Sequence, residues 1–317
     1  MKKLLLVLLL ISSIMLGVSS MSFAQYPEKE IQWIVPWAAG GSSDLMARAI
    51  GKVLPKYLGE EIVIVNKTGG AGTIANSWFK NQPTDGYTVI QNAVGIFNTQ
   101  PYLRKVNYEL SDYKGVIALS YEPVCIAVKA DAPYDTLEEM VNYFKEKNKA
   151  ISFAQSGAGS IPHITGEAFV DMVGLKGLQI AMEGENPAIL QMLGGHVDFA
   201  LSHPGSLIAK GDQVKILAIT GDERFSSLPD VPTFKEQGYD INTSVWKFIQ
   251  VPAGTPKERI EILHDAIKKA IEDPEFKKIA DNMDLTMRYL SGDEVDETLK
   301  TEGFFYKDII EKIGLGK

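Results

Sequence analysis

The sequence predicts an α/β fold with two lobes, each built on a mostly parallel sheet covered by helices. Short apolar segments alternate with segments that carry apolar residues at helical spacing, which is the pattern of βαβ units. A chain of 317 residues is also long enough to divide into two hydrophobic cores. Two cores imply a cleft, and ligands of such sheets bind at the carboxyl ends of the strands.

The first residues are expected to be a targeting segment and not part of the fold. Lys2 and Lys3 precede an apolar run at 4–18, and small residues follow up to Ala24. This run is shorter than the roughly 20 residues of a membrane span, so it predicts a signal peptide over 1–24, cleaved after Ala24. We therefore expect a soluble protein outside the cytoplasmic membrane, where the lone Cys125 has no internal disulfide partner and is expected to be a small buried side chain.

The balance of acidic and basic side chains indicates which kinds of partner the protein can bind. The chain has 32 basic and 40 acidic side chains, and loss of the two lysines in 1–24 leaves 30 against 40, a net charge of −10. An acidic surface without a basic run argues against nucleic acid and anionic membranes as partners. An anionic ligand must then be held by local dipoles.

The elements follow one another in a regular order. Apolar segments predict strands at Ile31 to Val35, Ile62 to Val65, Thr88 to Gln91, Ile151 to Ala154, Leu178 to Ile180, Val197 to Leu201 and Lys215 to Thr220. Helical spacing predicts helices at Leu45 to Leu58, Leu137 to Lys145, Gly166 to Val173 and Ala188 to Leu193.

Two segments echo each other and indicate where the chain passes between lobes. "PVCIAVKADAPYDTLEEMVNYFKE" and "FIQVPAGTPKERIEILHDAIKKA" each contain a strand, a turn and a helix start. Thr136 opens one helix, and Thr255 with Glu258 has the spacing of a capping box in the other, with Pro256 at the first helical position. We expect residues 26–119 and 230–317 to form one lobe and residues 120–229 to form an inserted second lobe.

The stretch "VPWAAGGSSD" predicts a binding loop between a strand and a helix. Pro36 ends the strand, two glycines permit unusual backbone angles, and Ser42 or Ser43 is expected to cap the helix. A helix start presents unpaired N–H groups and the positive end of a dipole, so it attracts anions. The alternative is a well-capped helix without a ligand, stabilised by an acidic residue in its first turn. The candidate ligand-binding residues of this first loop are Trp37, Ala38, Ala39, Gly40, Gly41, Ser42, Ser43 and Asp44.

A second stretch, "SFAQSGAGSIPH", has the same composition in the other predicted lobe. A strand again leads through glycines and hydroxyls into a helix start. Two such turns, one in each lobe, are expected to face each other across the cleft. The candidate residues of this second loop are Gln155, Ser156, Gly157, Gly159, Ser160 and His163.

Competing chemistries fit these residues less well. Neither loop supplies the Gly-Lys-Ser/Thr ending that a phosphate loop needs. A serine hydrolase would use Ser156 and His163, yet Ala154 stands where the nucleophile turn needs glycine and no acid is evident to orient the imidazole. The four histidines show no metal-ligand spacing with one another or with nearby carboxylates, so neither a metal nor a cofactor is expected.

The chain resembles a known family, the periplasmic solute-binding proteins of tripartite tricarboxylate transporters, or Bug-type receptors. The resemblance covers nearly the whole mature chain through "YPEKEIQWIVPWAAGGSSDLMAR", "VNKTGGAGTIA", "PTDGYTVI", "ISFAQSGAGSIPH", "LGGHVDFAL", "LPDVPTFKEQGY" and "VPAGTPKERI". It implies a type II periplasmic-binding-protein fold, the Venus flytrap, and a receptor instead of an enzyme. It also implies a small organic carboxylate as solute, the membrane permease subunits of the transporter as partners, and a monomeric receptor.

The resemblance places the carboxylate between the two glycine loops, with Met182 and Ser202 as further contacts. Where the family usually has Pro-Tyr-Lys-Gly, this chain reads Ala181-Met182-Glu183-Gly184, and Ser202-His203 replaces a frequent Asp-Asn pair. Losing a lysine and gaining Glu183 predicts that the far end of the solute is neutral, aromatic or cationic and is not a second carboxylate. A ring face of Trp37 is a further candidate contact. A ligand-binding sensor component remains an alternative to a transport receptor.

Overall fold

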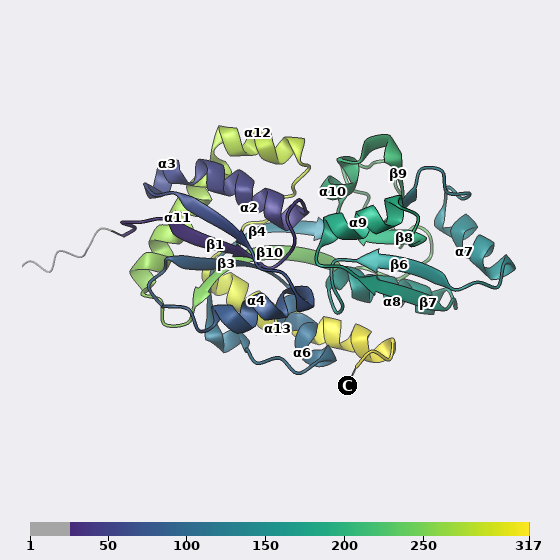
Figure 1. Cartoon of the computed structure of the whole chain (residues 1–317), viewed down its shortest axis with the longest axis horizontal. Helices are drawn as coiled ribbons and strands as arrows, with labels where there is room; N and C mark the ends of the chain where they lie inside the picture. Colours follow the sequence, from purple (N-terminus) through teal and green to yellow (C-terminus); the bar gives the residue numbers. More distant parts are fainter. Residues whose placement is uncertain (1–25, 317) are drawn as a thin grey trace, which may run out of the picture.

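The structure, a computed structural model, describes residues 26 to 316 and forms two five-stranded sheets that lie side by side (Figure 1). The strand order is β2-β1-β3-β10-β4 in the first sheet and β7-β6-β8-β5-β9 in the second. The predicted signal peptide lies outside the described residues. The strands are β1 (Ile31–Val35), β2 (Ile62–Asn66), β3 (Thr88–Ala93), β4 (Tyr113–Pro123), β5 (Cys125–Lys129), β6 (Ile151–Gln155), β7 (Gly177–Ala181), β8 (Phe199–Ser202), β9 (Val214–Ile219) and β10 (Ser244–Pro252).

Each sheet is mostly parallel, as the sequence predicts. In the first sheet β1 pairs in parallel with β2 and β3, while β10 runs antiparallel to both of its neighbours, β3 and β4. In the second sheet β6 pairs in parallel with β7 and β8, and β5 is antiparallel to β8 and β9. A single reversed strand in each sheet leaves the others pointing the same way. Their carboxyl ends therefore meet between the sheets, where the glycine loops begin.

Helices cover both faces of each sheet (Figure 1). Buried residues of α2, α11 and α12 pack on one face of the first sheet, and those of α4 and α13 pack on the other. In the second sheet α9 and α10 cover one face, and α7 and α8 cover the opposite one. The helices are α2 (Ser42–Val53), α3 (Pro55–Leu58), α4 (Thr73–Phe79), α5 (Gly95–Asn98), α6 (Gln100–Leu103), α7 (Leu137–Glu146), α8 (Ile161–Met172), α9 (Glu185–Leu193), α10 (Pro204–Ile208), α11 (Lys257–Glu272), α12 (Pro274–Asn282) and α13 (Gly292–Lys312).

The chain passes between the sheets next to the strand pair β4 and β10. Only Val124 separates β4 of the first sheet from β5 of the second, and the chain returns between β9 and β10. Val124 belongs to a cluster of buried apolar residues that extends through both lobes. Cys125 is fully buried, which confirms the expected small core side chain. Trp246 of β10 is fully buried too and donates a hydrogen bond to Glu302, so it belongs to the core.

Several predicted boundaries differ from the structure. The expected helix over 45–58 divides into α2 and α3 because Pro55 has no N–H to continue the ladder. Helices α8 and α9 each begin earlier than predicted, so Glu185 is already the first residue of α9. The cap at Thr136 is confirmed, whereas the capping box at Thr255 is wrong because its hydroxyl donates to Pro252 O.

Within residues 26 to 316, no helix has the length and apolar character needed to cross a bilayer.

Candidate functional site

The two glycine loops meet at one cavity between the sheets. Its volume is about 40 Å³. Five of the predicted site residues line it, three from the first loop and two from the second: Trp37, Gly41, Ser43, Ser156 and Ser160. Other lining residues that the sequence did not predict include Ala71, Ile96, Gln100, Ile161, Val245, Glu185, His203 and Lys247. The cavity thus has an apolar wall and a charged end.

A second cavity of about 160 Å³ shares Trp37, Ala71 and Ser156 with the first. Gly157 and Met182 line this outer space, and it also holds the charged side chains of Arg104 and Glu183. The two cavities thus share part of their lining, several predicted site residues lie along them, and the inner cavity is the smaller of the two.

Asp44 holds the first loop in place through hydrogen bonds and does not line the cavity. Its carboxylate accepts from the Gly40 N–H at 2.9 Å, from Arg48 Nε at 3.1 Å and from Asn66 Nδ2 at 2.9 Å. Burial by itself would raise the pKa of Asp44, but these hydrogen bonds and the Arg48 charge outweigh it and lower that pKa. Gly40 has φ +80, a left-handed conformation that glycine adopts without strain. Asp44 is therefore a positioning residue.

The helix that follows the first loop has no side-chain cap, contrary to the prediction. Gly41 occupies the N-cap position, and the first helical bond runs from Leu45 N to Gly41 O. Ser42 instead directs its hydroxyl at two carboxylates, with Oγ 2.9 Å from Glu122 Oε2 and 2.8 Å from Glu185 Oε1. The hydroxyl has one proton, so it can donate to only one of them at a time. The N–H groups of Ser42 and Ser43 precede the first helical bond.

A buried ionic cluster surrounds Ser42, and the sequence analysis did not identify it. Lys247 Nζ of β10 lies 2.7 Å from each carboxylate oxygen of Glu122 and also donates to Ser42. The exposed fractions of the Lys247 and Glu122 side chains are 2% and 6%. Charges this deeply buried persist in proteins only when they are paired and hydrogen-bonded.

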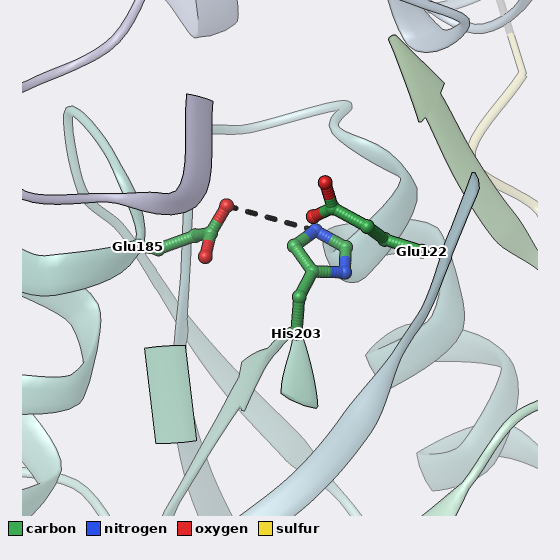
Figure 2. A group of neighbouring side chains, drawn as sticks. All are labelled: Glu122, Glu185 and His203. Carbon is green, nitrogen blue, oxygen red and sulfur yellow. Dashed lines mark ion pairs between the residues drawn. The ribbon is translucent and has the colours of Figure 1, made fainter. Parts of the chain in front are cut away.

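Glu185 joins this cluster from the second lobe. Its Oε2 accepts from Ser206 at 2.8 Å and from Ser202 at 3.3 Å, and its Oε1 lies 3.7 Å from His203 Nε2 (Figure 2). Burial would raise the pKa of Glu185, yet the charges of His203 and Lys247 and the serine hydroxyl bonds lower it well below its usual range. The carboxylate is therefore ionised at neutral pH.

Glu122, Glu185 and His203 also have the spacing of a metal site. Their ligand atoms lie within 4.8 Å of one another, so the expectation that no histidine stands at metal-ligand distance from carboxylates is wrong for His203 (Figure 2). However, the Lys247 ammonium already bonds both oxygens of Glu122. Lysine thus supplies the cation that a metal would otherwise provide. His203 Nδ1 lies 2.8 Å from Pro123 O, which orients the ring.

The second loop is held largely by its own side chains. Gln155 accepts from the Gly157 N–H, and His163 Nδ1 accepts from the Gly159 N–H at 3.0 Å. Ser160 caps α8 by accepting from His163 N. Because these amides are already bonded, Gln155 and His163 position the loop, while Ser156 and Ser160 line the cavity.

The same contacts contradict a hydrolase that uses Ser156 and His163. One imidazole nitrogen accepts from the Gly159 amide, and the other lies 3.4 Å from Glu167. Glu167 is thus an acidic neighbour of the imidazole, which the sequence analysis did not identify. In the described part of the chain, no hydrogen bond joins His163 to Ser156, so the imidazole is not placed to activate that hydroxyl.

Further contacts join the loops to the opposite lobe. The Ala38 N–H donates to Glu183 O at 2.9 Å, and Thr68 donates to the Glu183 carboxylate at 2.8 Å. Ala158 O of the second loop accepts from Gln100 at 3.0 Å and from Arg104 at 2.8 Å. The two lobes are thus closed on each other around both loops.

The remaining predicted residues lie at the edges of the site. Ala39 is exposed, Met182 packs against the core of the second lobe and Ser202 bonds Glu185. The sequence analysis did not predict Glu122, Glu185 and Lys247 as site residues. For two of them the sequence contains a signal that could have found them. Both Glu122 and Lys247 interrupt apolar strands, where a charge is rarely buried without a partner.

The chain is similar to known proteins over most of its length. The family model described as "Tripartite tricarboxylate transporter family receptor" matches residues 46–315. A Cupriavidus necator protein encoded in the gbd 5' region is 29% identical over 300 residues, which cover 92% of this chain and 90% of that protein.

Solved structures agree with this match. The periplasmic binding protein BugD superposes with a TM-score of 0.87 at 28% identity, covering 92% of this chain and 100% of BugD. Two Rhodopseudomonas palustris proteins, MatC with bound malate and another with adipate, have TM-scores of 0.84 and 0.86. They cover 90% and 92% of this chain and 100% and 99% of their own, and at 23% and 24% identity they show the shared fold. The chain therefore belongs to the tripartite tricarboxylate transporter receptor family, whose members are periplasmic solute-binding proteins of the Bug type and not enzymes.

Proposed function

We propose that this protein binds a small carboxylate-bearing solute between its lobes and delivers it to the membrane permease subunits of a tripartite tricarboxylate-type transporter. The cavity lined by both glycine loops is the single observation that carries the proposal. Malate in MatC and adipate in the second R. palustris protein, both carboxylates bound by proteins of this fold, also support it.

The binding groups follow from the loops. The Ser43 N–H at the start of α2 precedes the first helical bond, and Ser43 lines the cavity together with Ser156 and Ser160. These groups can donate hydrogen bonds to a carboxylate at a helix start, where the dipole favours negative charge. Trp37 and the apolar wall at Ile96 would contact the rest of the solute.

Closure of the lobes is the proposed mechanism. Each hydrogen bond to a charged group contributes about 1.5–3 kcal/mol, whereas association itself costs about 4–15 kcal/mol. A single loop would therefore bind weakly. When both loops contact the solute only in the closed form, binding favours closure. The proposed lobes are residues 26–119 with 230–317, and 120–229, in a monomer exported by the segment 1–24.

Native mass spectrometry of the purified protein tests this proposal, followed by calorimetric titration with the solute it identifies. We expect a co-purified carboxylate, stoichiometric binding, and a smaller radius of gyration with solute in X-ray scattering. Uptake of that solute should stop in cells that lack the receptor. The proposal is wrong if only compounds without a carboxylate bind, or if binding survives when the lobes stay open.

A further inference from the structure

The interlobe cavity contains a carboxylate of the protein itself, Glu185. This side chain is the first residue of α9, and it lines the cavity between the two glycine loops. A Cβ built on Gly41 would lie 3.6 Å from Glu185 Cβ and 3.7 Å from Glu185 N, so α9 begins directly against the first loop. An acidic side chain therefore lies beside the loop that is proposed to attract acids.

Glu185 already uses the hydroxyl that the first loop offers. Ser42 Oγ lies 2.8 Å from Glu185 Oε1, and the other oxygen of Glu185 accepts from Ser206 and Ser202. These partners hold the carboxylate in place from both lobes. A solute carboxylate that approached Ser42 would have to compete with a group already bonded there.

The lysine that lines the inner cavity is already paired. Lys247 is the only lysine or arginine among the residues that line the inner cavity, and it bonds both oxygens of Glu122. The cluster contains two carboxylates, those of Glu122 and Glu185, and the hydrogen bonds of the Lys247 ammonium to a carboxylate go to Glu122. The pKa of Glu185 is lowered, so the repulsion that it exerts on another anion persists at neutral pH. Ser156 and Ser160, which also line the cavity, carry no charge.

The rim acid that the sequence singled out has a different role. Glu183 is exposed, and its carboxylate accepts from Thr68 across the outer space. Water and salt screen an exposed charge of this kind. The acidic residue that lines the inner cavity is Glu185, two residues further along the chain.

We propose that Glu185 makes the receptor select solutes with a single carboxylate. That carboxylate would bind at the Ser156 and Ser160 end, and the other end of the solute would present an ammonium, amide or hydroxyl donor to Glu185. This selection rests on the proposed function of the site as a carboxylate receptor. A second carboxylate would lie beside an ionised glutamate at low dielectric, which disfavours dicarboxylates by roughly 100-fold.

Calorimetric titration with matched solutes tests the proposal. Succinate, succinamate, 4-aminobutyrate and butyrate share one carbon chain and differ only at one end, and the glutaric and adipic acid sets extend the length. We expect the wild type to bind the amide or amine member roughly 100-fold more tightly than the diacid of the same length. Glu185→Gln keeps the shape of the side chain, and it should reduce this preference to roughly tenfold or less.

Glu183→Gln is the comparison variant, and it should leave the preference largely in place. Equal binding of a diacid and its monoamide by the wild type would overturn the role of Glu185 while leaving the receptor function intact. An unchanged preference in a folded Glu185→Gln protein would overturn it as well. If no carboxylate in any set binds either protein, the proposed carboxylate receptor function itself fails.

Discussion

Replacing Lys247 with methionine tests whether the buried cluster holds the first lobe together. The ammonium bonds both oxygens of Glu122 at 2.7 Å, and both side chains are almost completely buried. Methionine keeps most of the apolar stem of lysine but removes the charge. The Glu122 carboxylate then stays buried and keeps its hydrogen bonds from the hydroxyls of Ser42 and Ser120, but it loses its ammonium partner.

The expected loss is large because the remaining charge is uncompensated. Breaking a buried ion pair by removing one partner costs about 3–5 kcal/mol. Domains are stable by only about 5–15 kcal/mol, so the Lys247→Met protein should unfold at a clearly lower urea concentration. Adding Glu122→Gln removes the second charge and keeps an oxygen that can accept hydrogen bonds. The double variant should therefore recover to within about 1.5 kcal/mol of the wild type.

Urea unfolding followed by tryptophan fluorescence measures this effect, since Trp246 is buried next to Lys247 in β10. Lys268→Met in α11, a half-buried lysine whose ammonium lies over Tyr289, controls for the loss of a lysine as such. The reasoning is refuted if Lys247→Met loses less than about 1 kcal/mol. It is also refuted if the double variant is no more stable than the single one, because the cost would then not come from an unpaired charge.

Two further predictions concern the second loop and the pH dependence of stability. Gly159→Ala should weaken solute binding at least tenfold with little effect on the far-ultraviolet spectrum, because its Cβ would lie 2.6 Å from Leu103 Cδ1 and 2.7 Å from Gln100 Nε2 and would obstruct closure. Gly174→Ala, at a similar positive φ with open space around it, should keep full affinity, and equal effects of the two variants would contradict the explanation. The pKa of Glu185 in the folded protein lies below its ordinary value of 4.5, so its contribution to stability is present above pH 4.5 and decreases as pH falls below it. In denaturation series from pH 6 downward, Glu185→Gln should show a weaker loss of stability in that window, and a curve parallel to the wild type would argue against the shift.

The alternation of apolar segments and helical spacing was enough to predict the α/β class and the mostly parallel sheets. Both features depend on local periodicity, which the sequence contains directly. The same holds for the glycine loops, since Gly40 needs its left-handed conformation regardless of what lies opposite. Predictions from local sequence were wrong where residues from distant parts of the chain contact the segment. Ser42 matches a helix cap in sequence, but two carboxylates from distant segments bind its hydroxyl instead.

The buried cluster depended on the tertiary structure alone. Glu122, Glu185 and Lys247 are far apart along the chain, and each belongs to a different element. A lone charge in the apolar strand around Lys247 indicates that a partner must exist, because an unpaired buried charge is too costly. Which residue pairs with it is determined by sheet order and by lobe closure. The sequence therefore determined which segments form the fold and where its glycine loops lie, whereas the packing of the two lobes decided which charges meet between them.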